Sequence, residues 1–193
     1  MGRHAQFKRQ DVVDKAAKTF WDLGFYATRM TDLIEATQLQ PGSLYAAFNS
    51  KDELFLECVH SYGQQLVANT EALLSQYSPK KAIIEYFQYL AGEVCTNSAP
   101  HGCLLVNSLL ELSRLDDKVK QAVEQYIDQM EQHFKKTINE AIALGEIKPS
   151  QDPQELATTL MVSMWGIRVL CETSEGRNKV PGVVKQVMKL LDI

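Results

Sequence analysis

The residues best suited to chemistry lie in a short segment, residues 40–51, that combines small side chains with hydrogen-bond donors. Pro41 favours the first turn of a helix. The small residues after it let the backbone approach another molecule closely: Gly42, Ser43, Ala46 and Ala47. Amides and hydroxyls at the amino end of such a helix can hold phosphate oxygens, while a few side chains reach base edges in the DNA major groove. Lys51 follows the helix, and Thr28 and Thr31 precede it, so donors flank it on both sides.

The elements that must position this segment are two short helices, expected over residues 31–37 and 41–48 and separated by a tight turn. That spacing is typical of a helix-turn-helix. Thr31 is expected to cap the first helix, and Leu39 to lie in the turn as an apolar plug. The other apolar residues of the segment are expected only to build the scaffold: Leu33, Ile34, Leu44 and Phe48.

Over residues 24–54 the sequence resembles the TetR/AcrR family of bacterial transcriptional regulators. The resemblance is carried by Gly24-Phe25-Tyr26, Thr28, Met30, Leu33-Ile34, Gly42-Ser43-Leu44-Tyr45, Phe48 and Ser50-Lys51-Asp52-Glu53-Leu54. It implies phosphate contacts from Tyr45 and Lys51, and places Gln40, Ser43 and Ala46 near base edges. It also implies an N-terminal arm that reaches the DNA backbone. The expected DNA-binding residues are Arg3, Lys8, Arg9, Thr28, Thr31, Gln40, Pro41, Gly42, Ser43, Tyr45, Ala46 and Lys51.

Two positions depart from the family pattern. Gln38 occupies the turn position where glycine is common, and a non-glycine residue with positive φ costs about 1 kcal/mol there. Gln40 stands where Ser or Thr often caps the second helix. Its side-chain amide makes Gln40 the best candidate for reading adenine.

The remainder of the chain predicts an all-α protein, because apolar residues recur at helical spacing nearly throughout. About nine helices are expected, over residues 9–23, 31–37, 41–48, 51–75, 79–97, 101–114, 117–144, 153–173 and 179–191. Capping boxes at 50–53 and 152–155 mark two helix starts, and Gly24 and Gly145 fit helix ends. We expect residues 1–50 to form a three-helix DNA-binding domain and residues 51–193 a helical bundle for effector binding and dimerisation.

Composition and charge bound the class of protein. Hydrophobic residues make up 45% and charged residues 23% of 193, which is typical of a soluble globular chain. The longest strongly apolar uncharged stretch, residues 156–167, is too short to span a bilayer, and residues 1–10 lack the apolar core of a secretory signal. We therefore expect a cytoplasmic protein without membrane contact. The net charge of −4 argues against a uniformly basic nucleic-acid binder, and residues 1–50, with a formal charge of +1, form the more anion-facing end.

One cysteine has two alternative interpretations. Gly102-Cys103-Leu104 resembles a motif of one branch of the family and places the Cys103 thiol at the start of the sixth expected helix. The helix N-terminal field and His101 would favour its thiolate form, as in a sensor of oxidants or electrophiles. The alternative is a small buried thiol that packs the helix start. Cys58, Cys95 and Cys171 fit core or incidental positions, and neither a metal site nor a cofactor is expected.

The larger part of the chain offers weaker signals for its ligand and partner. Residues that could line an apolar effector pocket, with ordinary bundle packing as the alternative, are Tyr62, Phe87, Asn107, Glu111, Tyr126, Met130, Trp165 and Arg168. The last two helices are apolar, and Gly166 permits close approach of a partner helix, which fits a two-fold interface. Its expected residues are Leu160, Met164, Ile167, Val184, Val187, Met188 and Leu191.

These observations lead to one functional hypothesis and two rivals. The hypothesis is a homodimeric regulator, expected to be a repressor, that is released from a palindromic double-stranded operator by an unknown small-molecule effector or by modification of Cys103. One rival is an enzyme with Cys103 as nucleophile and His101 or His133 as base, but no orienting carboxylate is assigned to either pair. The other is a helical adaptor that kept the fold and lost DNA binding. We expect a non-enzyme.

Overall fold

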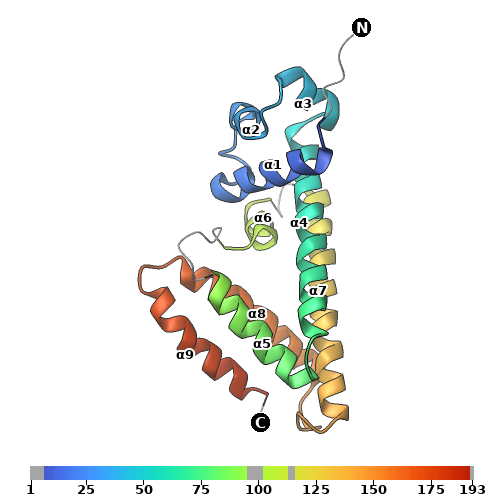
Figure 1. Ribbon diagram of the computed structural model, residues 1–193, viewed down its shortest axis with the longest axis vertical. Helices are drawn as coiled ribbons and strands as arrows, with labels where there is room; N and C mark the ends of the chain where they lie inside the picture. Colours follow the sequence, from blue (N-terminus) through green and yellow to red (C-terminus); the bar gives the residue numbers. More distant parts are fainter. Residues whose placement is uncertain (1–6, 95–101, 113–115, 192–193) are drawn as a thin grey trace. The chain divides into compact units, whose positions relative to one another are not determined.

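The computed structural model describes residues 7–94, 102–112 and 116–191. Within these residues every regular element is an α-helix, which confirms the all-α class (Figure 1). The helices are α1 (Arg9–Leu23), α2 (Met30–Thr37), α3 (Pro41–Phe48), α4 (Lys51–Leu74), α5 (Pro79–Val94), α6 (Leu104–Leu112), α7 (Asp117–Ala143), α8 (Pro153–Cys171) and α9 (Gly176–Lys189). The expected helix ends at 95–97, 101 and 113–114 lie outside the described residues. α9 begins at Gly176 rather than at residue 179.

The chain forms two compact units that share the long helices α4 and α7. The first consists of Met1–Gln64 with Leu104–Glu124, and the second of Gln65–Cys103 with Gln125–Ile193. The first unit therefore extends beyond residue 50 and includes α6. The functional division between DNA-binding residues 1–50 and effector-binding residues 51–193 stays a prediction.

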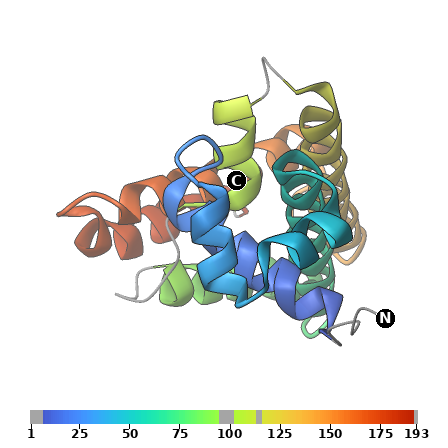
Figure 2. The same cartoon turned by 90° about the horizontal axis from the view of Figure 1, so that it is seen from above.

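The first unit is centred on aromatic rings. Phe55 of α4 lies with its ring centroid 4.9 Å from Phe20 of α1 and 4.9 Å from Phe25 in the α1–α2 turn. Leu33 of α2 and Leu44 of α3 are buried in the same unit. Viewed from above, α1, α2 and α3, coloured blue to cyan, cross one another rather than lying parallel (Figure 2). Each short helix thus buries one apolar side and leaves the other exposed.

Local capping explains most helix boundaries. Ser50 Oγ accepts a hydrogen bond from the Glu53 N–H at 3.1 Å, and the Asp152 carboxylate accepts from two N–H groups of the first turn of α8. Gly24 and Gly145 have φ values of +81° and +72° at helix ends. The expected Thr31 cap of α2 is wrong. α2 already begins at Met30, and Asp32 caps it by accepting the Arg29 N–H at 2.7 Å.

The second unit is built around an apolar core. α5, α8 and α9 run side by side (Figure 1), and the rings of Tyr86 and Phe134 meet edge to face with centroids 5.0 Å apart. Among the described residues, no helix is both long enough and apolar enough to cross a membrane.

The residues expected at a dimer interface also lie in this unit. Six of the seven are buried within the single chain: Leu160, Met164, Ile167, Val184, Val187 and Leu191. The seventh, Met188, is partly buried. A buried side chain has little surface left to lose to a partner. These residues form part of the core of the second unit, and their role at a dimer interface stays a prediction.

Candidate nucleic-acid interface

The α2–α3 corner has the geometry expected of a helix-turn-helix. Gln38 ends α2 in the left-handed conformation, with φ 61° and ψ 22°, and its side-chain amide donates to Glu35 O at 2.7 Å. Leu44 and Phe48 of α3 are buried, and Leu39 in the turn is partly buried. The burial of these apolar residues agrees with the scaffold role expected of them.

One side of α3 is exposed. Gln40, Pro41, Gly42 and Ala46 are exposed, Tyr45 is 48% exposed, and Ser43 is partly buried. A Cβ added at Gly42 would meet no atom within 4 Å, so internal packing does not require glycine there. The Gln40 side chain makes no hydrogen bond that caps α3. The amino end of α3 and its small residues are therefore free to meet a surface outside the chain.

Two residues expected to contact DNA are occupied inside the first unit. Lys51 Nζ donates to Phe25 O at 2.9 Å and to Thr28 O at 3.0 Å, and it lies 4.2 Å from the centroid of the Phe25 ring. Thr28 is 1% exposed, and its hydroxyl donates to Gly24 O at 2.6 Å. Both side chains hold the α1–α2 turn, whereas Thr31 is exposed.

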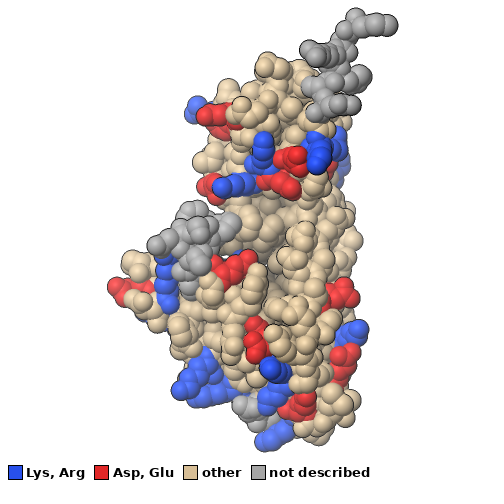
Figure 3. Space-filling view, in the orientation of Figure 1, with Lys and Arg blue, Asp and Glu red and all other residues tan. Residues whose placement is uncertain are grey.

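The N-terminal arm is also partly engaged. Arg9 forms a bidentate pair with Glu57, at 2.7 and 2.6 Å, and donates to Ala47 O at 2.8 Å near the end of α3. Its guanidinium lies 4.2 Å from the centroid of the Phe48 ring. Arg9 thus joins α1, α3 and α4. Lys8 is exposed, and Arg3 lies outside the described residues. On the face shown in Figure 3, both signs of charge are interspersed over the first unit.

The expected effector residues divide between the two units. Tyr62, Asn107 and Glu111 belong to the first unit, where Tyr62 packs edge-on against Trp21 and the Glu111 carboxylate accepts two backbone N–H groups. The others belong to the second unit, where all but the partly buried Trp165 are buried: Phe87, Cys103, Tyr126, Met130, Trp165 and Arg168. His101 lies outside the described residues. In the described part of the chain, no three His, Cys, Asp or Glu side chains cluster closely enough to hold a metal ion.

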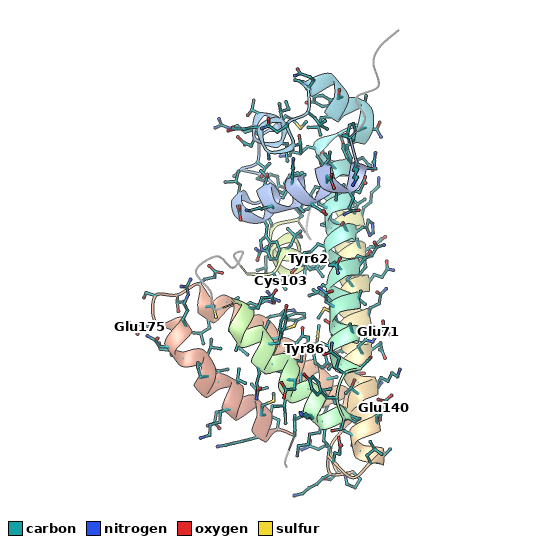
Figure 4. All side chains as sticks on the ribbon, viewed as in Figure 1. Tyr62, Glu71, Tyr86, Cys103, Glu140 and Glu175 are labelled. Atoms are coloured by element: carbon teal, nitrogen blue, oxygen red, sulfur yellow. The ribbon has the colours of Figure 1, made fainter. Side chains whose placement is uncertain are left out.

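Sequence reasoning missed one polar group in the second unit, Tyr86 (Figure 4). Its hydroxyl donates to the Met164 sulfur at 3.1 Å. Burial raises the pKa of Tyr86 to about 12, and a hydrogen bond with Thr70 and the charge of Arg168 oppose the rise. Electrostatic interactions with Cys103 and Glu93 act in the same direction as burial and raise the pKa of this phenol. The helical period predicts that residue 86 lies in the core, but it does not predict that the Tyr86 hydroxyl forms a buried polar contact there.

Two other features of the described chain are a buried cysteine and a pocket, and neither involves the residues expected to bind the effector. Burial raises the pKa of the Cys58 thiol, whose hydrogen bond goes to Val13 O, as expected of a thiol that packs in the core. A pocket of about 320 Å³ lies in the second unit, and its lining includes Glu71 of α4 and His133 and Glu140 of α7. Glu71 and Glu140 are labelled in Figure 4. None of the residues expected to bind the effector lines this pocket.

Comparisons with known proteins agree with this geometry. Residues 12–58 match the family described as bacterial regulatory proteins, tetR family, and residues 81–180 match the tetracyclin repressor-like C-terminal domain. The transcriptional repressor ComR of Escherichia coli K12 is 28% identical, over 98% of this chain and 91% of ComR. The repressor DhaR of Mycobacterium sp. GP1 is 25% identical, over 95% and 91%. A cysteine mutant of the TetR-family regulator CifR, solved with a 26-bp operator duplex, superposes with a TM-score of 0.87 at 26% identity, over 98% of this chain and all of that one.

The C-terminal match alone covers more than half of the 193 residues, and the N-terminal match covers the helix-turn-helix described above. The chain belongs to the TetR family of bacterial transcriptional regulators.

Proposed function

We propose that the chain is a transcriptional repressor that binds a palindromic operator as a homodimer, with α3 in the major groove. The observation that carries this proposal is the division of α3 into a buried side, Leu44 and Phe48, and an exposed side that begins at Gln40. Exposed glycine and alanine on a short helix contribute little to stability, but they permit close approach to a phosphate backbone.

The exposed residues take distinct roles in this proposal. The hydroxyl of Tyr45 donates to a phosphate oxygen, and the amide of Gln40 pairs with an adenine edge. Lys8 and Thr31 add exposed donors on either side. Lys51, Thr28 and Arg9 act mainly by holding the α1–α2 turn and α3 in place, because their polar groups already have partners in the chain.

A dimer would present two copies of α3 to one face of the duplex, about 34 Å apart for successive major grooves. Support for an interface on α8 comes from its outward face, where Val162 and Val169 are 57% and 60% exposed and Trp165 lies between them. Gly166 is exposed beside them, with open space where a Cβ would stand. Sedimentation velocity measures the mass, and a monomer at concentrations that bind DNA would contradict the proposal.

The DNA proposal is tested with a duplex that the wild-type protein enriches from a random-sequence pool, with affinity measured by fluorescence anisotropy. Tyr45→Phe and Gln40→Ala should each weaken binding to this duplex by about tenfold, the scale of one good polar contact. The matched control is Tyr89→Phe, an exposed tyrosine on α5, which should bind like the wild type. An enzyme or adaptor would enrich no sequence and would bind with no dependence on these residues.

We further propose that the second unit receives the effector and that Cys103 can release DNA on modification. Buried polar groups in an apolar core, Tyr86, Arg168 and Cys103, support a ligand site there. A thermal-shift screen of metabolites and electrophiles tests whether the chain binds such an effector. For the second, Cys103→Ser should abolish release of DNA by an electrophile. Release that persists in this variant would exclude the thiol.

A further inference from the structure

α6 contributes one charged side chain to the first unit that the helix-turn-helix motif does not contain. Glu111 is partly buried near the end of α6, one residue before the buried Leu112. Its two carboxylate oxygens each accept one backbone N–H of the α1–α2 turn, from Phe25 at 3.0 Å and from Tyr26 at 2.8 Å. The partners are more than 80 residues apart in the sequence, and Glu111 lies outside the 12–58 match to the family's N-terminal domain.

Lys51 binds two carbonyl groups of the same turn. The Phe25 peptide N–H thus faces a carboxylate, and the Phe25 carbonyl faces an ammonium group. Hydrogen bonds to charged groups are stronger than those between neutral groups. A Cβ placed at Gly24 would stand 3.2 Å from a Glu111 carboxylate oxygen, so the absence of a side chain there leaves room for this contact.

The turn leads directly into the DNA-facing helices. Residues 24–29 connect α1 to α2, and only Gln38, Leu39 and Gln40 separate α2 from α3. A shift of the turn would therefore be passed along α2 to α3. Arg9 restrains the far end of α3 through Ala47 O, so charged side chains hold both the turn and the end of α3.

We propose that Glu111 is a positioning residue for operator recognition: its carboxylate fixes the α1–α2 turn, and thereby the placement of α3 in the groove. This inference rests on the proposed function. Without Glu111 the two N–H donors lose their partner, and Phe25, which is 8% exposed, has little access to water as a substitute.

The experiment uses the full-length chain and the duplex enriched by the wild type, with a scrambled duplex of the same length as the non-selective probe. Glu111→Ala should lower affinity for the enriched duplex by about tenfold and leave affinity for the scrambled duplex unchanged or raised. Glu111→Gln keeps one acceptor oxygen and should restore part of the loss. Amide exchange at Phe25 and Tyr26 should quicken in Glu111→Ala.

The matched control is Glu124→Gln, which removes a negative charge from an exposed residue of α7 in the same unit. Loss of a negative charge alone should tighten DNA binding, so the expected weakening for Glu111 has the opposite sign. If Glu111→Ala does not fold, selectivity is compared in Glu111→Gln, which keeps the shape of the side chain. Unchanged or tighter selective binding in these variants overturns the inference alone. A wild-type chain that enriches no sequence overturns the proposed function, and this inference with it.

Discussion

The two units of the molecule differ in what their long-range charged hydrogen bonds hold. In the first, charged side chains bind backbone groups far along the chain: Arg9 to Ala47, Lys51 to Phe25 and Thr28, and Glu111 to Phe25 and Tyr26. In the second, comparable bonds hold helix starts and loops: Glu146 accepts the Lys80 N–H, Glu172 accepts the Gly102 N–H, and Arg168 donates to Gly102 O. Large apolar side chains are fully buried in both units. Directional bonds fix the position of a short helix, whereas apolar burial supplies stability without fixing a direction.

This difference implies a division of labour. A short helix such as α3 buries too few residues to be positioned by packing alone. The first unit therefore adds a few long-range polar bonds that hold the α1–α2 turn and the end of α3, while both units have an apolar core, with Phe55 fully buried in the first and Phe134 in the second. Substitutions should then separate: those of buried apolar side chains mainly change stability, and those of the charged side chains that hold the α1–α2 turn and α3 also change the placement of the DNA-facing surface.

The largest effect is expected at Phe134 in the second unit. Its ring is fully buried and packs against Tyr86 and Phe87, so Phe134→Ala should lower the free energy of unfolding by about 3–5 kcal/mol. Urea denaturation at one fixed protein concentration measures this loss. Tyr89→Ala removes an aromatic ring that is 57% exposed and should cost less than about 0.5 kcal/mol. A loss below about 1 kcal/mol for Phe134→Ala would break the comparison, because the second unit would not depend on its core.

An intermediate effect is expected at Lys51 in the first unit. Lys51→Met keeps the aliphatic stem and removes both hydrogen bonds to the α1–α2 turn, so it should cost about 1–3 kcal/mol. The control is Lys118→Met, whose side chain is 72% exposed and lies 3.4 Å from Glu53, where the cost should stay within about 1 kcal/mol.

The salt dependence of DNA binding then sharpens the assignment of Lys51. A lysine that binds phosphate lowers the salt slope by about one when it is removed, whereas a lysine that holds the turn mainly lowers stability and selectivity. If Lys51→Met and the wild type have equal free energies of unfolding and the salt slope of DNA binding is reduced, Lys51 binds phosphate as the family resemblance implies.

The sequence predicted most of the fold because its signals are local. Helical periodicity and caps such as Ser50 and Asp152 set boundaries that the structure confirms to within a few residues. The exposed side of α3 could be expected for the same reason, since Pro41 and its small neighbours lie within one short helix.

What could not be predicted depends on partners distant in the chain. No local pattern pairs Arg9 with Glu57 or Glu111 with Phe25, although an acidic residue within the apolar run of α6 was a usable signal. In the second unit, periodicity shows that α8 has an apolar side, but not whether that side faces its own core or another copy. Leu160 and Met164 were therefore expected at an interface and lie in the core.

The smallest effect, and one of opposite sign, is expected at Gln38. Its φ of 61° is unfavourable for a residue with a Cβ, so Gln38→Gly should stabilise the chain by up to about 1 kcal/mol. The gain is reduced by loss of the exposed hydrogen bond to Glu35 O. Gln38→Ala loses the same bond and keeps the strain, so the difference in unfolding energy between the two variants isolates the backbone contribution. If Gln38→Gly and Gln38→Ala unfold at the same urea concentration, the backbone at residue 38 carries no conformational strain. The polar bonds of the first unit would then hold a corner that has no local conformational cost at this position.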